Sequence, residues 1–318
     1  MKKNIYNEFL KLYWLKPVDS VWDSVCANYV FNWVNKHKVI LDLGCGDGLN
    51  TAITFGAEIK DTYDRYDKAK SSYTGIYEKR GKRETQFGDI YKNQVTTKLK
   101  KKPLRNINYG LELKNHHIKV AKNLKIYDQI FKSDFENIPL ENSKVDCIFS
   151  IFAFYWGNNI KEQIKEANRV LKKGGEFVVT LPSEHLSDMH HAYNLSRNMK
   201  ISSNLRELLS EMNGNRQKFV SFHGRKIQAW EKIFNRGGFK LIQTKKIINE
   251  KLFFIQDIVQ RFYTSYLIKY NSDNKNFLKF RKEFVKFNRM YLDSMFKEES
   301  NINNNTRFAY YCLKFKKI

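Results

Sequence analysis

Short apolar runs and amphipathic segments follow one another along most of the chain. Apolar residues spaced by three and four predict helices, whereas short β-branched and leucine runs predict buried strands. Strands that alternate with helices predict an α/β fold, in which a doubly wound, mostly parallel seven-stranded sheet carries helices on both faces. The predicted strands lie at 38–43, 107–113, 128–134, 145–152, 174–182, 239–248 and 306–317.

The same pattern divides the chain into a core and its additions. The pattern predicts N-terminal helices over residues 1–36 and a core that holds the sheet over residues 37–250 and 303–318. A segment at about 57–106 has little clean periodicity and delays the second core strand, so we predict an insertion there. Residues 251–302 predict a helical insertion rich in aromatic residues before the last strand.

The basic composition allows two interpretations. The formal net charge is +24, and residues 60–105 carry 14 basic and 6 acidic side chains, a net charge of +8. A basic surface is typical of proteins that bind nucleic acid. However, 43 of the 57 basic residues are Lys and 14 are Arg, whereas bidentate phosphate recognition favours Arg. The charge therefore leaves open whether an anionic partner or a compositional bias toward Lys is its cause.

Other features narrow the class of protein. No apolar run approaches the ~20 residues that span a bilayer, and the N-terminus lacks the apolar segment and cleavage site of a signal peptide. We therefore expect a cytoplasmic protein without a membrane span. The four cysteines, Cys26, Cys45, Cys147 and Cys312, are too widely spaced for a zinc knuckle, so we expect free thiols and no metal.

A glycine-rich turn follows the first predicted strand, with Gly44, Gly46 and Gly48 at alternate positions. Glycine lets the backbone approach a ligand where a Cβ would collide. The dinucleotide fingerprint G-x-G-x-x-G would need its third glycine at position 49, which is Leu49. The spacing therefore disfavours a nicotinamide dinucleotide site.

Further motifs follow this turn in a fixed order. The turn, preceded by Asp42, resembles motif I of the class I S-adenosylmethionine-dependent methyltransferases, of the type 11 kind. Residues 134–139 resemble the family's phrase D-x-x-x-L-P, and residues 169–175 its phrase R-V-L-K-P-G-G, with Lys173 in place of Pro. The resemblance covers residues 38–182 except for the insertion. It implies a Rossmann-like fold, S-adenosylmethionine as cofactor and methyl transfer as the activity.

The resemblance also implies which residues hold the methionine and ribose parts of the cofactor. Backbone atoms of residues 44–46 would line the methionine end, with Asp42 beneath them. An acid at the end of the second core strand would bind the ribose, and Glu112 has that place. Asp64 is a rival, because it lies about 20 residues after the glycines.

At the other end of the cofactor, Asp134 and Phe135 would flank the adenine, and Ser150 would lie near the sulfonium. The helical insertion would then cap the acceptor side. The implied cofactor-binding residues are Asp42, Gly44, Cys45, Gly46, Glu112, Asp134, Phe135 and Ser150.

Two histidines are candidates for a general base. A hydroxyl acceptor often needs a base whose pKa lies near the working pH, and His is the natural type. His185 follows the fifth core strand, at the edge of the sheet where such sites form. His223 precedes a predicted helix. We predict these two as catalytic residues, and the sequence leaves open whether the reaction uses a base.

Three functions remain after these steps. The first is methyl transfer to a small-molecule, sugar or lipid-linked acceptor, with oxygen as the expected acceptor atom. The second is methylation of RNA, which the net charge favours. The third is a regulatory or partner subunit that binds the cofactor without catalysis. The sequence does not identify the acceptor molecule or the oligomeric state.

Overall fold

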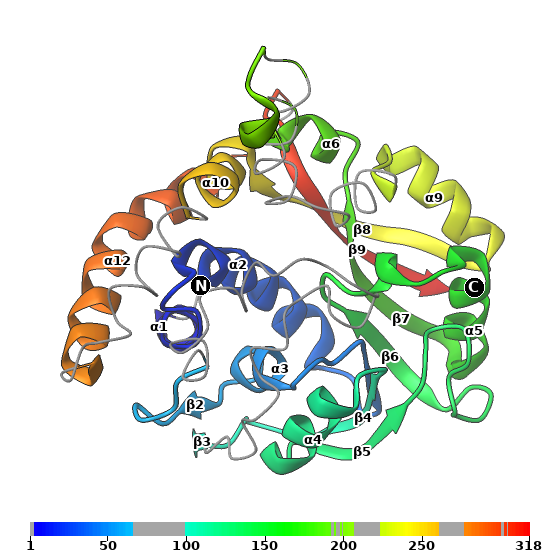
Figure 1. Ribbon diagram of the computed structural model, residues 1–318. Helices are drawn as coiled ribbons and strands as arrows, with labels where there is room; N and C mark the ends of the chain where they lie inside the picture. Colours follow the sequence, from blue (N-terminus) through cyan, green and yellow to red (C-terminus); the bar gives the residue numbers. More distant parts are fainter. Residues whose placement is uncertain are drawn as a thin grey trace.

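A computed structural model describes residues 3–65, 99–191, 194, 198, 200–206, 223–260, 277–299, 302–303 and 305–318. Within these ranges, a seven-stranded sheet forms the centre of an α/β fold, with helices on both faces (Figure 1). Across the sheet the strands are β5 (Tyr127–Lys132), β4 (Ile107–Glu112), β1 (Ile40–Leu43), β6 (Val145–Ser150), β7 (Leu171–Pro182), β9 (Phe308–Lys317) and β8 (Phe239–Asn249). The pairings of β9 are antiparallel and the other pairings are parallel, which confirms the predicted fold class.

The described helices follow the predicted order and precede, separate or follow these strands. They are α1 (Lys3–Leu12), α2 (Pro17–Val34), α3 (Leu49–Thr54), α4 (Asn115–Leu124), α5 (Ile160–Val170), α6 (Leu186–Met189), α9 (Ile227–Arg236), α10 (Glu250–Phe254) and α12 (Phe277–Glu299), with a 3₁₀ turn at Phe154–Trp156 and a π-helical turn at Ile255–Gln260.

Aromatic side chains join each helical layer to the sheet. On one face, Phe31 of α2 packs against Phe55, and Phe55 packs against Phe149 of β6, with ring centroids 5.9 and 6.1 Å apart. On the opposite face, which α5 and α9 cover in Figure 1, Phe234 of α9 stacks on Phe315 of β9 at 4.0 Å. All five rings belong to one continuous hydrophobic core or pack against it. The close packing of this core holds the sheet and the loops at its carboxyl edge rigidly.

One helix is shorter than its sequence pattern. Apolar residues spaced by three and four over 159–173 predict a helix, but it ends at Val170, because Leu171 is extended (φ −75°, ψ 140°) and pairs with Val145. The helix begins where expected, since the Asn159 side chain accepts the Lys161 N–H at 3.2 Å and caps its first turn.

The predicted insertion starts and ends at a short ladder outside the main sheet. Strand β2 (Glu58–Ile59) pairs antiparallel with β3 (Leu99–Lys101), so the two ends of the segment lie side by side. Residues 66–98 lie outside the described ranges. The insertion at about 57–106 and its function therefore remain predictions.

Two buried polar side chains tie the helical insertion to the N-terminal helices. The Gln260 side-chain oxygen accepts the Val18 N–H of α2 at 2.7 Å. Arg281 of α12 donates to the carbonyl oxygens of Tyr63 at 2.6 Å and of Lys11 at 3.1 Å. The Gln260 contact thus holds α2, and the Arg281 contacts hold α1 and the segment at Tyr63. Within the described ranges, no helix combines the length and hydropathy that a membrane span requires.

Candidate functional site

The glycine turn after β1 has a backbone that only glycine adopts easily. Gly44, Gly46 and Gly48 have φ angles of +87°, +56° and +78°. A Cβ on Gly44 would lie 2.5 Å from the Ala153 Cβ, so this glycine permits a close approach of two chain segments. A Cβ on Gly46 would meet nothing within 4 Å. The turn therefore presents bare backbone to open space at Gly46.

The end of β4 holds this turn in place. The Leu111 carbonyl accepts the N–H groups of Gly44 and Cys45 at 2.9 and 3.0 Å. The Glu112 carboxylate accepts the Gly46 N–H at 3.0 Å. The Cys45 thiol is buried and faces β4, because a Cβ on Gly110 would lie 3.2 Å from its sulfur. Cys45 therefore offers the site its backbone and not its thiol.

Glu112 is held in its charged form. Its other carboxylate oxygen accepts the N–H groups of Leu113 and Lys114 at 2.8 and 2.9 Å. Burial disfavours the charge, but the nearby His117 ring nitrogen, 3.7 Å from the carboxylate, and these N–H groups outweigh it and lower the pKa of Glu112. The site thus contains an ionised acid at the end of β4, next to the open position at Gly46.

Asp42 supports the turn from below, inside the protein. Its Oδ2 accepts hydrogen bonds from Thr51 Oγ1 at 2.5 Å and from Tyr127 Oη at 2.6 Å. Burial raises the pKa of Asp42 to about 7. The carboxyl group therefore anchors β1 to α3 and β5.

Two further acids near the turn have partners that sequence spacing does not reveal. Asp47 forms a buried ion pair with Arg65 at 2.6 Å, and its Oδ1 accepts the Leu49 N–H that starts α3. The positive charge of Arg65 outweighs the effect of burial and lowers the pKa of Asp47. Asp64, the rival for the ribose, accepts the Trp14 indole N–H at 2.9 Å. The structure thus directs Asp64 toward the N-terminal helices and Glu112 toward the turn.

The loop after β5 carries Asp134 and Phe135. Asp134 is exposed, and its Oδ1 accepts the Glu136 N–H and the Asn137 side-chain N–H, both at 3.0 Å. The Phe135 ring lies against Gly44, because a Cβ there would be 3.1 Å from its Cζ. The loop after β5 and the glycine turn therefore lie side by side and form two neighbouring walls of the candidate site.

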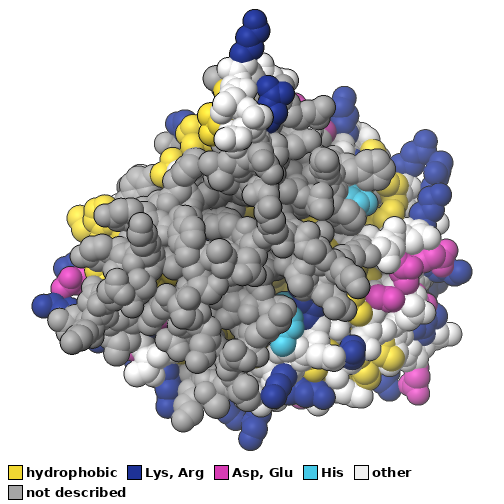
Figure 2. Space-filling model, viewed as in Figure 1, with side chains coloured by type: hydrophobic (Ala, Val, Ile, Leu, Met, Phe, Trp, Pro, Cys, Tyr) yellow, Lys and Arg dark blue, Asp and Glu magenta, His cyan; other side chains and the backbone are white. Residues whose placement is uncertain are grey.

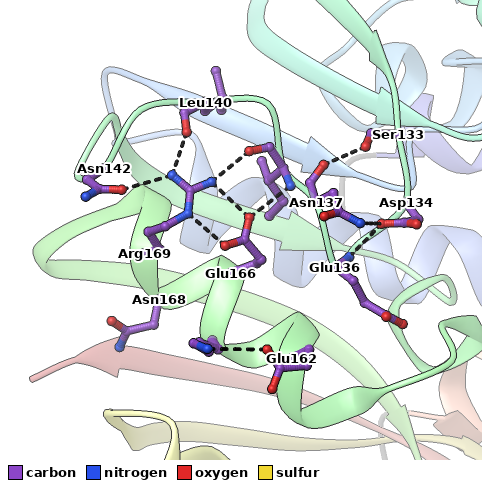
Figure 3. A network of polar contacts seen from close by, with 12 residues as sticks. Ser133, Asp134, Glu136, Asn137, Leu140, Asn142, Glu162, Glu166, Asn168 and Arg169 are labelled. Atoms are coloured by element: carbon purple, nitrogen blue, oxygen red, sulfur yellow. Dashed lines mark hydrogen bonds and ion pairs between the residues drawn. The ribbon is translucent and has the colours of Figure 1, made fainter.

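Arg169 of α5 clamps this loop from outside (Figure 3). Its guanidinium binds both oxygens of Glu166, at 2.7 and 2.9 Å. It also donates to the carbonyl oxygens of Leu140 at 2.7 Å and Ile138 at 2.8 Å. Glu166 in turn accepts the Ile138 N–H at 3.0 Å. This network explains physically why an Arg follows the loop by about thirty residues: it fixes the path of the loop that bears Asp134.

The end of β6 passes over the glycine turn. The Ser150 hydroxyl is buried and donates to the Leu43 carbonyl at 2.6 Å, so it joins two strands. Phe152 has φ +52°, which is rare for a residue with a Cβ, and its N–H donates to Thr180 Oγ1 at 2.5 Å. Such a backbone places Ala153 against Gly44. Strained residues of this kind often occur at functional sites.

The two candidate histidines are both attached to the end of β7. The His185 N–H donates to Ser183 Oγ at 3.2 Å, and its ring packs edge-on against Phe308. His223 stands two residues before Arg225, whose N–H donates to the Pro182 carbonyl at 3.3 Å. Burial and the charge of Arg225 lower the pKa of His223. Both histidines thus lie at the same edge of the sheet as the glycine turn.

Several residues of the candidate site have no local signal in the sequence. Ala153, Thr180, Arg65 and His117 take part through contacts with residues far away in the chain. On the described part of the face in Figure 2, Lys and Arg side chains stand around the rim, with Asp and Glu among them. Most of the basic segment 60–105 lies outside the described ranges.

Parts of the chain are similar to known methyltransferases. Residues 92–179 match the family model of a methyltransferase domain, and the glycine turn lies before that match. The chain is 32% identical over 79 residues to a sarcosine/dimethylglycine N-methyltransferase of Aphanothece halophytica. These 79 residues are 25% of this chain and 28% of that protein. Over 100 residues it is 26% identical to malonyl-[acyl-carrier protein] O-methyltransferase 1 of Coxiella burnetii, which covers 31% and 34%.

The chain thus spans about a third of the length of these curated relatives. Among solved structures, it is similar to a geranyl diphosphate methyltransferase in complex with S-adenosylmethionine. That comparison has a TM-score of 0.42 and 9% identity, and it covers 93% of this chain and 85% of the other.

Proposed function

We propose that the chain is a class I S-adenosylmethionine-dependent methyltransferase that transfers a methyl group to a small-molecule, sugar or lipid-linked acceptor, at oxygen. The match of residues 92–179 to the family model of a methyltransferase domain supports this proposal, and S-adenosylmethionine would be the cofactor. The observation that carries the proposal is the glycine turn, where Gly46 faces open space beside the ionised Glu112.

The residues around this turn fit the parts of the cofactor. The bare backbone at Gly46 leaves room for an amino-acid chain, which a Cβ at that position would obstruct. Of the about four lone-pair sites on the Glu112 carboxylate, three accept backbone N–H groups, which leaves about one for a ribose hydroxyl. Phe135 supplies an apolar surface for the adenine, and the Asp134 oxygens face solvent beside it. Gly44, Cys45 and Gly46 would bind through backbone atoms above Asp42.

The cofactor, when bound, supplies an activated methyl group on sulfur, and the protein has to orient the acceptor toward it. The strained turn at Phe152 and the buried Ser150 would keep the end of β6 in a fixed position beside the reacting atoms. A hydroxyl acceptor would give its proton to His223 or His185. The lowered pKa of His223 favours this role, because the ring is then neutral near pH 7.

The first experiment is a thermal melt with S-adenosylhomocysteine, with NAD as the control ligand. A ligand at 100 times its Kd stabilises the folded state by about 2.7 kcal/mol. With an unfolding entropy of about 2.1 cal/mol/K per residue, we expect a shift of roughly 4 °C. A shift with NAD and none with S-adenosylhomocysteine would refute the proposal.

Two variants connect this shift with the glycine turn. Gly46→Trp fills the open space, so we expect the shift to disappear. Gly174→Trp is a matched control, because Gly174 also has a positive φ (+74°) and a Cβ there would meet only the end of the Lys316 side chain, at 3.7 Å, but Gly174 lies near the start of β7. We expect the control to keep the shift. Equal loss in both variants would contradict the placement of the cofactor at Gly46.

RNA methylation is the second candidate, and the net charge of +24 favours it. It predicts that binding of RNA weakens steeply with salt, because each phosphate contact releases counterions. Measurement of the affinity for RNA at salt concentrations between about 50 and 200 mM tests this. A cofactor-binding subunit without catalysis would give the melting shift but no transfer of labelled methyl groups to any acceptor pool.

A further inference from the structure

The guanidinium of Arg225 is a partly enclosed positive charge without an acceptor. Arg225 is half-buried, and among the residues that the structure describes no carboxylate or carbonyl oxygen lies within bonding distance of its side chain. Its Nε is enclosed and makes no hydrogen bond. Because a charge that is partly removed from water without a partner costs free energy, this arrangement needs an explanation.

Five other buried or half-buried arginines have acceptors, which sets Arg225 apart from them. Arg65 binds Asp47, Arg307 binds Glu250, Arg169 binds Glu166, and Arg105 and Arg281 bind backbone carbonyl oxygens. In these cases the partner comes from the protein itself. At Arg225, a ligand can take the place of such a partner.

Contacts at the end of β7 hold Arg225 in position. The Pro182 carbonyl accepts the Arg225 N–H at 3.3 Å and the Trp230 indole N–H at 3.0 Å. The guanidinium carbon lies 5.5 Å from the centroid of the Trp230 ring, which is fully buried and therefore a fixed support. Nη1 and Nη2 are not enclosed, so both atoms are open to a ligand from solvent.

Arg225 lies beside both histidines that are candidates for the general base. It forms a parallel bridge with Ser183, whose Oγ accepts the His185 N–H at 3.2 Å. His223 is two residues away, and the positive charge of Arg225 acts on its ring. The cation therefore lies where the proposed function expects the acceptor hydroxyl.

The acid that follows Ser183 has partners of its own. Glu184 accepts the Tyr311 hydroxyl at 2.9 Å and lies 3.9 Å from the His185 ring nitrogen. A planar guanidinium matches the oxygens of a carboxylate or phosphate in a bidentate pair. The positive charge and the two open nitrogens of Arg225 therefore favour an anionic ligand over a neutral one.

Resting on the proposed function, we propose that Nη1 and Nη2 of Arg225 bind an anionic group of the methyl acceptor. The acceptor is then a small molecule that carries a carboxylate or a phosphate near its hydroxyl. The bound anion orients the hydroxyl toward His223 or His185. A neutral analogue leaves the guanidinium unpaired and binds more weakly.

Histidine NMR on the full chain tests this proposal, because His223 senses the charge at Arg225. Burial and that charge lower the pKa of His223, so an anion paired with Arg225 should raise it. The protein is labelled with ¹³C-histidine and saturated with S-adenosylhomocysteine, and His223→Asn identifies the His223 signal among the seven histidines. The anionic probes are glycolate and glycerol phosphate, and their neutral controls are glycolamide and glycerol.

We expect glycolate or glycerol phosphate to raise the pKa of His223 by at least about 0.5 and the neutral controls to leave it unchanged. The probe with the lower Kd shows whether the anionic group is a carboxylate or a phosphate. A His223 signal that neither anion moves, or that the neutral controls move equally, overturns the proposal. An RNA oligonucleotide that moves it while both small anions fail also overturns it.

The same titration without S-adenosylhomocysteine separates two possible failures. A chain that does not bind S-adenosylhomocysteine refutes the proposed function. The anion titration still reports on Arg225 in that case, so the failure of the proposed function and the failure of the anion site are distinguishable.

Substitutions complete the test. Arg225→Gln should raise the Kd of the anionic probe by about 10- to 150-fold, as for a lost hydrogen bond to a charged group, and leave the affinity for S-adenosylhomocysteine within twofold. Arg225→Lys keeps the charge without the fork, so its Kd should lie between the two. Arg236→Gln is the matched control, because Arg236 is an exposed arginine of α9. An unchanged Kd in Arg225→Gln, or an equal loss in Arg236→Gln, contradicts the proposal.

Discussion

The Glu112 carboxylate accepts the Gly46 N–H at 3.0 Å, so this charged side chain holds the glycine turn after β1 together with the Leu111 carbonyl. In Glu112→Gln, one carboxylate oxygen becomes an NH₂ group that cannot accept an N–H. We expect the Kd for S-adenosylhomocysteine to rise by about 10- to 150-fold, as for the loss of about 1.5–3 kcal/mol in hydrogen bonds to a charged group. Isothermal titration calorimetry measures this change.

Glu141→Gln is the matched control for that experiment. Glu141 is exposed and pairs only with Lys144 in the contacts described, at 3.0 Å. Its replacement should leave cofactor affinity unchanged, because exposed ion pairs contribute little. An affinity loss in Glu141→Gln equal to that in Glu112→Gln would show that the effect is not specific to the turn.

Arg169→Met removes the clamp on the loop that bears Asp134. The carbonyl oxygens of Leu140 and Ile138, the Asn142 side-chain oxygen and the Glu166 carboxylate would lose a charged donor, so we expect the free energy of unfolding to fall by about 2–3 kcal/mol. For a chain of this length, that is a fall in Tm of roughly 3–4 °C. Lys165→Met on the same helix is the control, since Lys165 is exposed and, among the described residues, pairs with Glu162 at 3.5 Å. Equal melting temperatures for wild type and Arg169→Met would refute the clamp.

The pKa of Asp42 predicts a pH dependence of stability. Burial raises this pKa from 3.8 to about 7. Between these values the folded protein keeps a proton that the unfolded chain has lost, so the contribution of Asp42 to stability falls as the pH rises from about 4 to 7. Asp42→Asn lacks this term. The Tm of the variant minus that of the wild type should therefore increase over this range and level off above it. A constant difference from pH 4 to 8 would contradict the raised pKa.

His223 predicts the acid limb of the pH–rate profile. Burial and Arg225 lower its pKa below the usual 6.5, and a neutral ring is the form that accepts a proton. We expect kcat/KM to rise through a midpoint below pH 6.5. His223→Asn should lower kcat by about 10²–10⁴-fold and remove this limb.

Arg225→Gln is the accompanying test, because it removes the positive charge and leaves the ring. The midpoint of the acid limb should then move up toward 6.5. If neither substitution changes the profile, His185 becomes the remaining histidine candidate for the base.

The strands and the glycine turn were predictable because their signals are local. The run that ends at Leu43 is apolar except for Asp42, and a helix begins three residues after the strand that ends at Glu112. Positive φ at Gly44 and Gly46 follows from the spacing of the glycines. Such features depend on neighbours in the sequence, so periodicity and residue type are sufficient to find them.

The side-chain partners were not predictable, because they join distant parts of the chain. Asp42 accepts a hydrogen bond from Tyr127, and Asp64 accepts one from Trp14. Ser150 was predicted beside the sulfonium, and its hydroxyl bonds to the Leu43 carbonyl. Residue type shows that these groups can bond, whereas the fold decides which partner they meet.

Ile59 pairs antiparallel with Leu99, and this pairing allows the segment between them to vary in length. The chain leaves the core and returns to it at this short ladder, so the two ends of the intervening segment are held next to each other. Closure of a loop costs only about 0.6 kcal/mol for each doubling of its length. Segments of very different length can therefore replace residues 60–98 between β2 and β3, by evolution or by engineering, while β4 and Glu112 at its end keep their positions.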